Sequence, residues 1–333
     1  MNYISFGRTG IKVSRLVIGS WYLPHLKESR NGVYPVDKDA SIKLIKKAYD
    51  LGINFFDTAD VYRGVYDRSG KNPDFSSIGT SEKIIGEALK GYDRESFVIS
   101  TKVMGRVGPL VNDSGLNRKH VKNAIKKSLE RLGMDYVDIY FMHANDNITS
   151  LEDAVKTMNL LINDGKILHY GVSNFEAFEI TQMYNFAFNR GLDVPSAIQD
   201  EYNLLNRDIE KTNLVVSNRY DMASMIYSPL AQGILAGRYL NKGNVISRKD
   251  YDPKFIDDVN FELNNKKVQK LNELAKTKGY TCAQLALSWL LHQGKFIFPI
   301  IGISNEEQLL DNLGAIDVSL NNDDLKAISE IFL

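Results

Sequence analysis

The sequence has little cysteine, no excess of charge of either sign and no long apolar run. Its single cysteine, Cys282, cannot form a disulfide within the chain, which fits a reducing compartment. The 41 basic and 41 acidic residues cancel, which argues against a dedicated nucleic-acid binder, because such proteins usually carry a basic excess. No apolar run approaches the ~20 residues that cross a bilayer, and the N-terminus lacks a signal-peptide pattern. We therefore expect a cytoplasmic protein that contacts neither nucleic acid nor membrane.

Histidines are also few, and they are scattered along the chain. Two histidines four residues apart would lie on one face of a helix and could share a metal ion, but this spacing does not occur. The five histidines are His25, His120, His143, His169 and His292. The sequence predicts no metal site.

Short apolar runs alternate with amphipathic helical stretches along almost the whole chain. Most of these runs are apolar throughout rather than alternating, which is typical of parallel strands buried on both faces. There are eight runs, at residues 16–22, 53–59, 97–103, 137–142, 167–172, 197–199, 223–227 and 296–303. Strand-then-helix repeated eight times predicts one (β/α)8 TIM barrel of the α/β class over residues 1–333. An open doubly wound sheet is the alternative, but no G-x-G-x-x-G motif follows the first run.

The helical stretches carry their own start and stop signals. Asp37 and Asn117 stand where N-caps belong, and Gly133 can end the helix that follows Asn117. Ser150 with Asp153 predicts a capping box. Residues 2–6 and 12–14 predict a β-hairpin that plugs the barrel before its first strand. Long loops at 23–36, 63–79, 105–116 and 231–258 should rim the C-terminal face, where barrel active sites lie.

Ionisable side chains stand at or just after the ends of three successive predicted strands. Asp57 lies near the end of the second and Tyr62 follows it, Lys102 lies near the end of the third, and His143 follows the fourth. Because a buried charge is costly unless paired, Asp57 and Lys102 should form a pair. An ammonium near a phenol should lower its pKa from ~10, so that the phenol can protonate an oxygen that becomes an alkoxide. Each residue alone has an ordinary structural explanation, but together they favour carbonyl reduction with hydride from a cofactor.

These motifs resemble the aldo-keto reductase superfamily over essentially the whole chain. The resemblance is carried by FGRTG at 6–10, FFDTA at 55–59 followed by Tyr62, GKI at 165–167, GVSNF at 171–175 and YSPLAQG at 227–233, with Gln308 and Asn312 near the end. It implies a catalytic tetrad of Asp57, Tyr62, Lys102 and His143. Tyr62 would be the general acid, Lys102 and Asp57 would tune it, and His143 would orient the carbonyl of a small-molecule aldehyde or ketone.

The resemblance also implies an extended NADPH across the barrel mouth. Ser173, Asn174 and Gln199 would bond the carboxamide and Tyr227 would stack on the nicotinamide. The remaining implied contacts are Gly19, Ser20 and Trp21 beside the reacting end, Ser228, Leu230 and Gln232 at the pyrophosphate, and Gly302, Gln308 and Asn312 towards the adenosine.

The adenosine end departs from the family pattern. Ser304 stands where many relatives place Arg or Lys for the 2′-phosphate, and Glu306 and Glu307 follow it. NADH is therefore the alternative cofactor. Arg238 and Arg248, in the loop after the seventh strand, are the candidate phosphate ligands, because a guanidinium matches phosphate geometry; the alternative is that both are solvated.

The stretch 63–79 is longer than in most relatives and contains flexible turn residues. Its position next to Tyr62 suggests a lid or substrate wall, with an oligomer contact as the alternative. The sequence indicates no particular oligomeric state. Two other functions remain: a regulatory subunit that senses nicotinamide cofactor with little turnover, and a barrel isomerase or lyase, for which the late loops offer a poor phosphate cradle.

Overall fold

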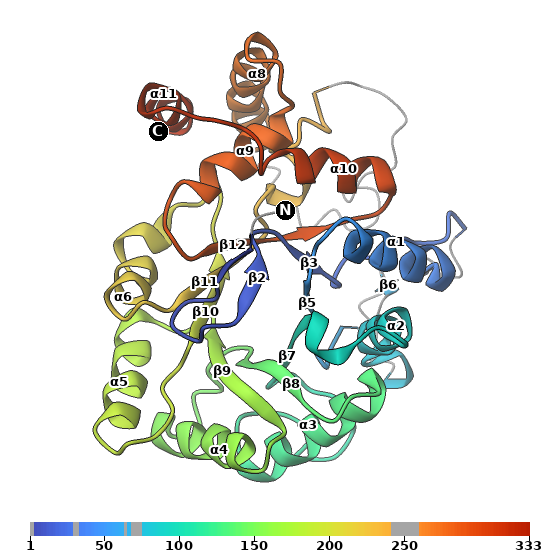
Figure 1. Cartoon of the computed structure of the whole chain (residues 1–333), viewed down its shortest axis with the longest axis vertical. Helices are drawn as coiled ribbons and strands as arrows, with labels where there is room; N and C mark the ends of the chain where they lie inside the picture. Colours follow the sequence, from blue (N-terminus) through green and yellow to red (C-terminus); the bar gives the residue numbers. More distant parts are fainter. Residues whose placement is uncertain (1–2, 29–32, 63–64, 68–74, 241–259) are drawn as a thin grey trace.

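Eight parallel strands form a closed barrel at the centre of the molecule (Figure 1). The computed structural model describes residues 3–28, 33–62, 65–67, 75–240 and 260–333. The barrel strands are β3 (Val17–Gly19), β5 (Phe55–Asp57), β7 (Val98–Val103), β8 (Val137–Met142), β9 (Ile167–Ser173), β10 (Ala197–Glu201), β11 (Ala223–Tyr227) and β12 (Ile297–Gly302). Pairing of β12 with β3 closes the ring. The predicted barrel and the place of each of its strands are confirmed.

The predicted N-terminal hairpin is also present. Strand β1 (Tyr3–Ser5) pairs antiparallel with β2 (Lys12–Ser14). The fully buried ring of Phe6 packs against Phe55 and Phe298, with centroids 5.3 and 5.2 Å away. The hairpin thus delivers an aromatic side chain into the barrel core, and the opposite, C-terminal end is left for a site.

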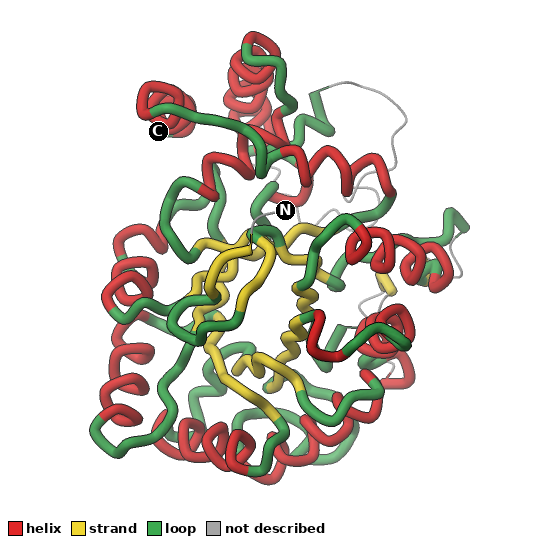
Figure 2. The backbone as a smooth tube through the Cα atoms, viewed as in Figure 1, coloured by secondary structure: helices red, strands yellow, loops and turns green. Residues whose placement is uncertain are grey.

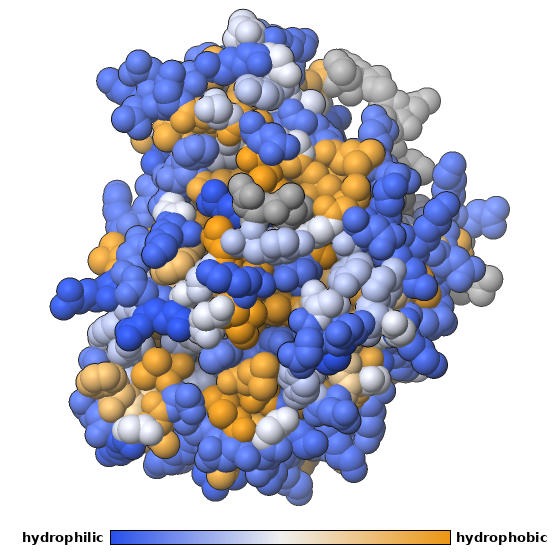
Figure 3. Space-filling view, in the orientation of Figure 1, coloured by the Kyte–Doolittle hydropathy of each residue, from blue (hydrophilic) through white to orange (hydrophobic). Residues whose placement is uncertain are grey.

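Helices surround the barrel (Figure 2). They are α1 (Lys38–Asp50), α2 (Thr80–Leu89), α3 (Arg118–Leu132), α4 (Leu151–Asn163), α5 (Ala177–Phe188), α6 (Asn213–Arg219), α8 (Phe261–Thr277), α9 (Cys282–Leu291), α10 (Glu306–Gly314) and α11 (Asn322–Phe332), with short 3-10 helices at Phe75–Ser77, Arg94–Ser96, Asp208–Lys211 and Ala231–Gly233. On the face shown, hydrophilic side chains cover most of the outer rim and apolar ones gather towards the centre (Figure 3).

The predicted helix ends are largely confirmed. Asp37 accepts a hydrogen bond from the N–H of Ala40, and Asn117 from that of His120. Gly133 adopts a left-handed φ of 68° after α3, a conformation that glycine reaches without strain. The predicted capping box is wrong. Ser150 accepts a hydrogen bond from the N–H of Asp153, but the Asp153 carboxylate does not return to the N–H of Ser150 and instead lies 3.5 Å from the ammonium of Lys156.

The two long loops nearest the first strands pair with each other. Strand β4 (Val33–Pro35) from the first loop is antiparallel to β6 (Val65–Asp67) from the stretch 63–79. Residues 63–64 and 68–74 of that stretch lie outside the described residues, so its role as lid, wall or contact stays a prediction. Among the residues that the structure describes, no helix combines the length and apolarity needed to span a membrane.

Candidate active site

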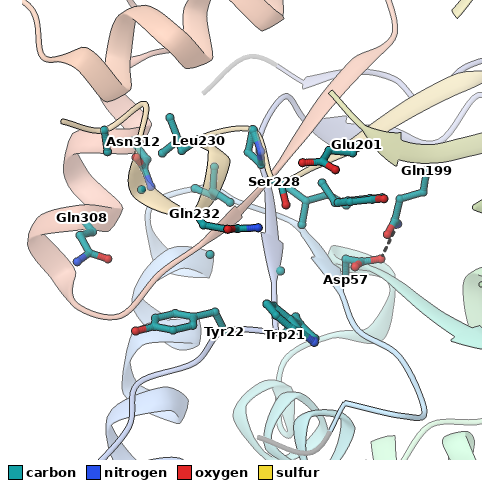
Figure 4. A pocket seen from close by; sticks show the side chains of 18 of the residues that line it. Trp21, Tyr22, Asp57, Gln199, Glu201, Ser228, Leu230, Gln232, Gln308 and Asn312 are labelled. Atoms are coloured by element: carbon teal, nitrogen blue, oxygen red, sulfur yellow. Dashed lines mark hydrogen bonds between the residues drawn. The ribbon is translucent and has the colours of Figure 1, made fainter. Parts of the chain in front are cut away.

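A cavity of about 670 Å³ opens at the C-terminal ends of the barrel strands, where the sequence placed the site (Figure 4). Most predicted site residues line it: Gly19, Trp21, Asp57, Tyr62, His143, Ser173, Asn174, Gln199, Tyr227, Ser228, Leu230, Gln232, Arg238, Gly302, Gln308 and Asn312. We call the part around Asp57, Tyr62, His143, Gln199 and Tyr227 the nicotinamide end. The part around Leu230, Gln232, Arg238, Gln308 and Asn312 is the adenosine end.

Lys102 lies fully buried beneath the nicotinamide end and bridges two of the predicted tetrad residues. Its ammonium donates to Asp57 Oδ2 at 2.6 Å, to the Thr58 carbonyl at 2.8 Å and to the Tyr62 phenol oxygen at 3.2 Å. The parallel register that aligns Asp57 with Ser100 explains this, because Lys102 follows Ser100 on the same inward face. Since the ammonium donates to the phenol oxygen, the phenol O–H remains available to donate elsewhere.

The Asp57 carboxylate is fixed from three directions. Besides Lys102, it accepts hydrogen bonds at Oδ1 from the Ser100 hydroxyl at 2.7 Å and from Gln199 Nε2 at 3.1 Å. These partners come from neighbouring β7 and from β10 across the barrel. With these partners the carboxylate is held in one position, and it in turn holds the ammonium in place.

His143 faces Tyr62 across the cavity wall, with ring centroids 5.9 Å apart and planes inclined by 72°. Two hydrogen bonds fix the backbone of His143: its N–H donates to the Val103 carbonyl, and its carbonyl accepts from Asn174 Nδ2. Burial and the neighbouring Lys102 lower the pKa of His143 to about 3. The imidazole is therefore neutral at physiological pH.

The pKa of Tyr62 differs from our expectation. The sequence suggested that Lys102 would lower it, but burial raises the pKa of Tyr62 above its ordinary 10, and Lys102 only offsets part of that rise. Burial also disfavours the ammonium of Lys102, yet Asp57 and Tyr62 raise the pKa of Lys102 overall. At neutral pH the pair is thus a protonated phenol beside an ammonium.

Asn174 links the tetrad to Tyr227. Its amide oxygen accepts from the Tyr227 hydroxyl at 2.9 Å, while its amide nitrogen also contacts Ser173 Oγ at 3.0 Å. The backbone of Asn174 has a left-handed φ of 57°, supported by a hydrogen bond from its N–H to Asp200. Asparagine tolerates this conformation better than most residues, so the turn after β9 aims the amide into the cavity.

The adenosine end is built from loops and from α10. Arg238 returns from the loop after β11 to line the cavity, and its side chain packs over Gly233. Asn305 caps α10 by accepting from the N–H of Gln308. Arg248, the other predicted phosphate ligand, lies outside the described residues.

Two predicted cofactor contacts lie elsewhere. Ser20 is buried behind the wall, because strand alternation turns it outward from Gly19, and its carbonyl accepts from Ser81 Oγ. Ser304 is not part of the cavity wall; its hydroxyl donates to Gln308 Oε1 at 2.7 Å. Neither residue lines the cavity, and their contacts with a cofactor stay predictions.

The cavity wall also contains Tyr22 beside Trp21, and residues that the sequence analysis did not select: Val61, Glu201, Pro229, Gly233, Ala236, Ala283, Ile300, Ile301 and Asp311. Glu201 could have been found, because it stands two residues after Gln199 and a strand repeats its facing every second residue. In the described part of the chain, no three His, Cys, Asp or Glu side chains converge as metal ligands would.

Comparison with known proteins agrees with this architecture. The model of the aldo/keto reductase family matches residues 15–332. The chain belongs to the aldo/keto reductase family. Members of this oxidoreductase family generally bind a nicotinamide cofactor, as the barrel and its open mouth allow.

Three similar relatives are named as putative or probable voltage-gated potassium channel subunits beta. The one from Schizosaccharomyces pombe is 35% identical, covering 98% of this chain and 91% of its own length. Those from Oryza sativa subsp. japonica and Arabidopsis thaliana are each 33% identical, over 96% of this chain and 92% of theirs.

Proposed function

We propose that this aldo/keto reductase reduces aldehydes or ketones to alcohols with NAD(P)H, and that Tyr62 is the general acid. The observation that carries the proposal is the Lys102 ammonium, which bonds both Asp57 and the Tyr62 phenol while the phenol faces the cavity. An acid of this kind must be protonated before the reaction and must lose its proton into a stabilised anion. The buried ammonium provides that stabilisation.

The residues present fit an extended dinucleotide. Paired amide donors and acceptors, Asn174 and Gln199, lie at one end with the flat ring of Tyr227, and Arg238 offers a cation to a phosphate at the other. The cavity volume lies within the range of cofactor sites. When bound, the nicotinamide supplies the hydride that the side chains cannot provide. We propose NADPH as the preferred cofactor because of Arg238, with NADH as the alternative.

The chain's own groups then have separate tasks. Neutral His143 hydrogen-bonds the substrate carbonyl oxygen and orients it towards the Tyr62 hydroxyl. As negative charge develops on that oxygen, Tyr62 donates its proton, and Lys102 stabilises the resulting phenolate. Asp57, fixed by Ser100 and Gln199, holds the ammonium beneath the phenol throughout.

The test is NADPH consumption with an aromatic aldehyde, with Tyr62→Phe compared with wild type. Loss of the general acid should reduce kcat by about 10²- to 10⁴-fold. Cofactor affinity, followed by fluorescence, should stay close to wild type because the ring is retained. Tyr3→Phe, on the exposed hairpin, is the matched control and should behave as wild type. Equal rates for Tyr62→Phe and wild type would remove Tyr62 from the mechanism.

The names of the relatives favour a second candidate, a cofactor-binding subunit of a potassium channel with little turnover. The complete set of four tetrad residues around the cavity supports the enzyme instead. The same assay separates the two functions. Tight cofactor binding without turnover over a broad panel of carbonyl compounds would favour the subunit, whereas turnover lost in Tyr62→Phe would favour the reductase.

A further inference from the structure

The carboxylate of Glu201 lies in the cavity wall beside the nicotinamide end, outside the predicted tetrad. Glu201 is the last residue of β10 and pairs in register with Tyr227 on β11. It stands two residues beyond Gln199, so both side chains belong to the inward face of the strand. Figure 4 shows Glu201 pointing towards Ser228, above Gln199 and Asp57.

The surroundings hold this carboxylate in place. The side chains of Asn203 and Asn206 donate to it, which favours the charged form, whereas partial burial opposes it and raises the pKa of Glu201. Glu201 is also the strongest charged influence on Tyr227, whose pKa burial and this carboxylate raise to about 12. The Glu201 carboxylate therefore exerts an electrostatic effect at the position where the nicotinamide ring would stack.

The other charges at this end largely cancel. Asp57 and Lys102 form an ion pair at 2.6 Å, and His143, Tyr62 and Tyr227 are neutral at physiological pH. Asp200 faces outward from the barrel, where Asn213 Nδ2 and the N–H of Asn174 bind its carboxylate. Among the described residues that line the nicotinamide end, Glu201 thus supplies the uncompensated charge, and it is negative.

Oxidised and reduced nicotinamide cofactors differ by one positive charge, which the oxidised ring carries. Their phosphates, riboses and adenine are the same, so contacts at the adenosine end cancel when the two affinities are compared. We propose that Glu201 makes this site bind the oxidised cofactor in preference to the reduced one. The inference rests on the proposed cofactor site and adds a redox-state preference to it. The carboxylate attracts the cationic ring and has no such attraction for the neutral one.

The experiment measures dissociation constants for NADP⁺ and NADPH by protein fluorescence, which Trp21 in the cavity wall reports. In Glu201→Gln the preference for NADP⁺ over NADPH should fall about tenfold, the effect of removing ~1.4 kcal/mol of charge attraction. Asp311→Asn is the matched control, because it removes a carboxylate from the same cavity next to Asn312. It should change both affinities by the same factor and leave their ratio unchanged.

A second variant and the pH dependence distinguish loss of the charge from a folding defect in Glu201→Gln. Glu201→Asp retains the charge and should retain the preference. In wild type the preference should weaken as the pH falls and Glu201 becomes protonated, and this dependence should be absent in Glu201→Gln. An unchanged ratio in folded Glu201→Gln, or a ratio lost equally in Glu201→Asp, would overturn the inference. Failure of wild type to bind either cofactor would instead refute the proposed function.

Discussion

The two ends of the cavity are built by different means. At the nicotinamide end, Asp57, Lys102 and Gln199 come from barrel strands and bond one another across the barrel. At the adenosine end, the side chains come from a loop and from α10, and Gln308 bonds Ser304 within its own segment. One end is therefore fixed by the sheet, whereas the other depends on local chain geometry.

This difference matches two different demands. Proton transfer requires groups held within a fraction of an ångström by a supporting set of hydrogen bonds, which strands provide. Recognition of the cofactor's far end requires only affinity, which loops can supply and vary. We therefore expect substitutions at the nicotinamide end to affect stability and chemistry together, and those at the adenosine end to affect cofactor choice alone.

Removing Lys102 should give the largest effect. Lys102→Met leaves the buried Asp57 carboxylate without its cation, and breaking a buried ion pair in this way costs about 3–5 kcal/mol of folding free energy. Chemical denaturation should show this loss, and kcat/KM should fall by about 10²-fold or more, because the Tyr62 phenolate loses its stabilising charge.

The double variant Asp57→Asn with Lys102→Met is the control for that prediction. It removes both charges, so stability should return towards wild type, whereas activity should stay low. A double variant no more stable than Lys102→Met would show that the unpaired carboxylate is not the cause. The stability of the strand-built end would then depend less on the Asp57–Lys102 ion pair than we infer.

Arg238→Ala tests the other side of the comparison, with a smaller effect. A charge-assisted bond to the 2′-phosphate is worth roughly 1.5–3 kcal/mol, so affinity for NADPH should fall about tenfold or more. Affinity for NADH, which lacks that phosphate, and the unfolding midpoint should both change little. Arg118→Ala, on the exposed start of α3, provides the matched control. Equal weakening of both cofactors would place Arg238 away from the 2′-phosphate.

The sequence predicted the strand-built parts better than the loop-built parts. The barrel strands follow from apolar runs buried on both faces, and the approach of Lys102 to Asp57 follows from their order on adjacent strands. The pairing of Val33–Pro35 with Val65–Asp67 has no such signal in the sequence, because each segment is only three residues long and lies within a long irregular loop. The direction of the Tyr62 pKa shift depends on burial by distant segments, so local pattern alone gave the wrong sign.

The smallest expected effect concerns the pH dependence of kcat/KM, which reports on burial at the nicotinamide end. The pKa of His143 is lowered from 6.5 to about 3, so the folded protein keeps this imidazole neutral until the pH approaches that value. Consequently kcat/KM should show no limb from His143 between pH ~5 and ~8, where an ordinary histidine titrates. His143→Gln, which cannot ionise there, should be slower yet give a parallel profile. A change in wild-type kcat/KM near pH ~6.5 that is absent from His143→Gln would contradict this prediction, because it would show that the imidazole gains a proton beside Lys102. Water would then solvate the strand-built end as freely as the adenosine end.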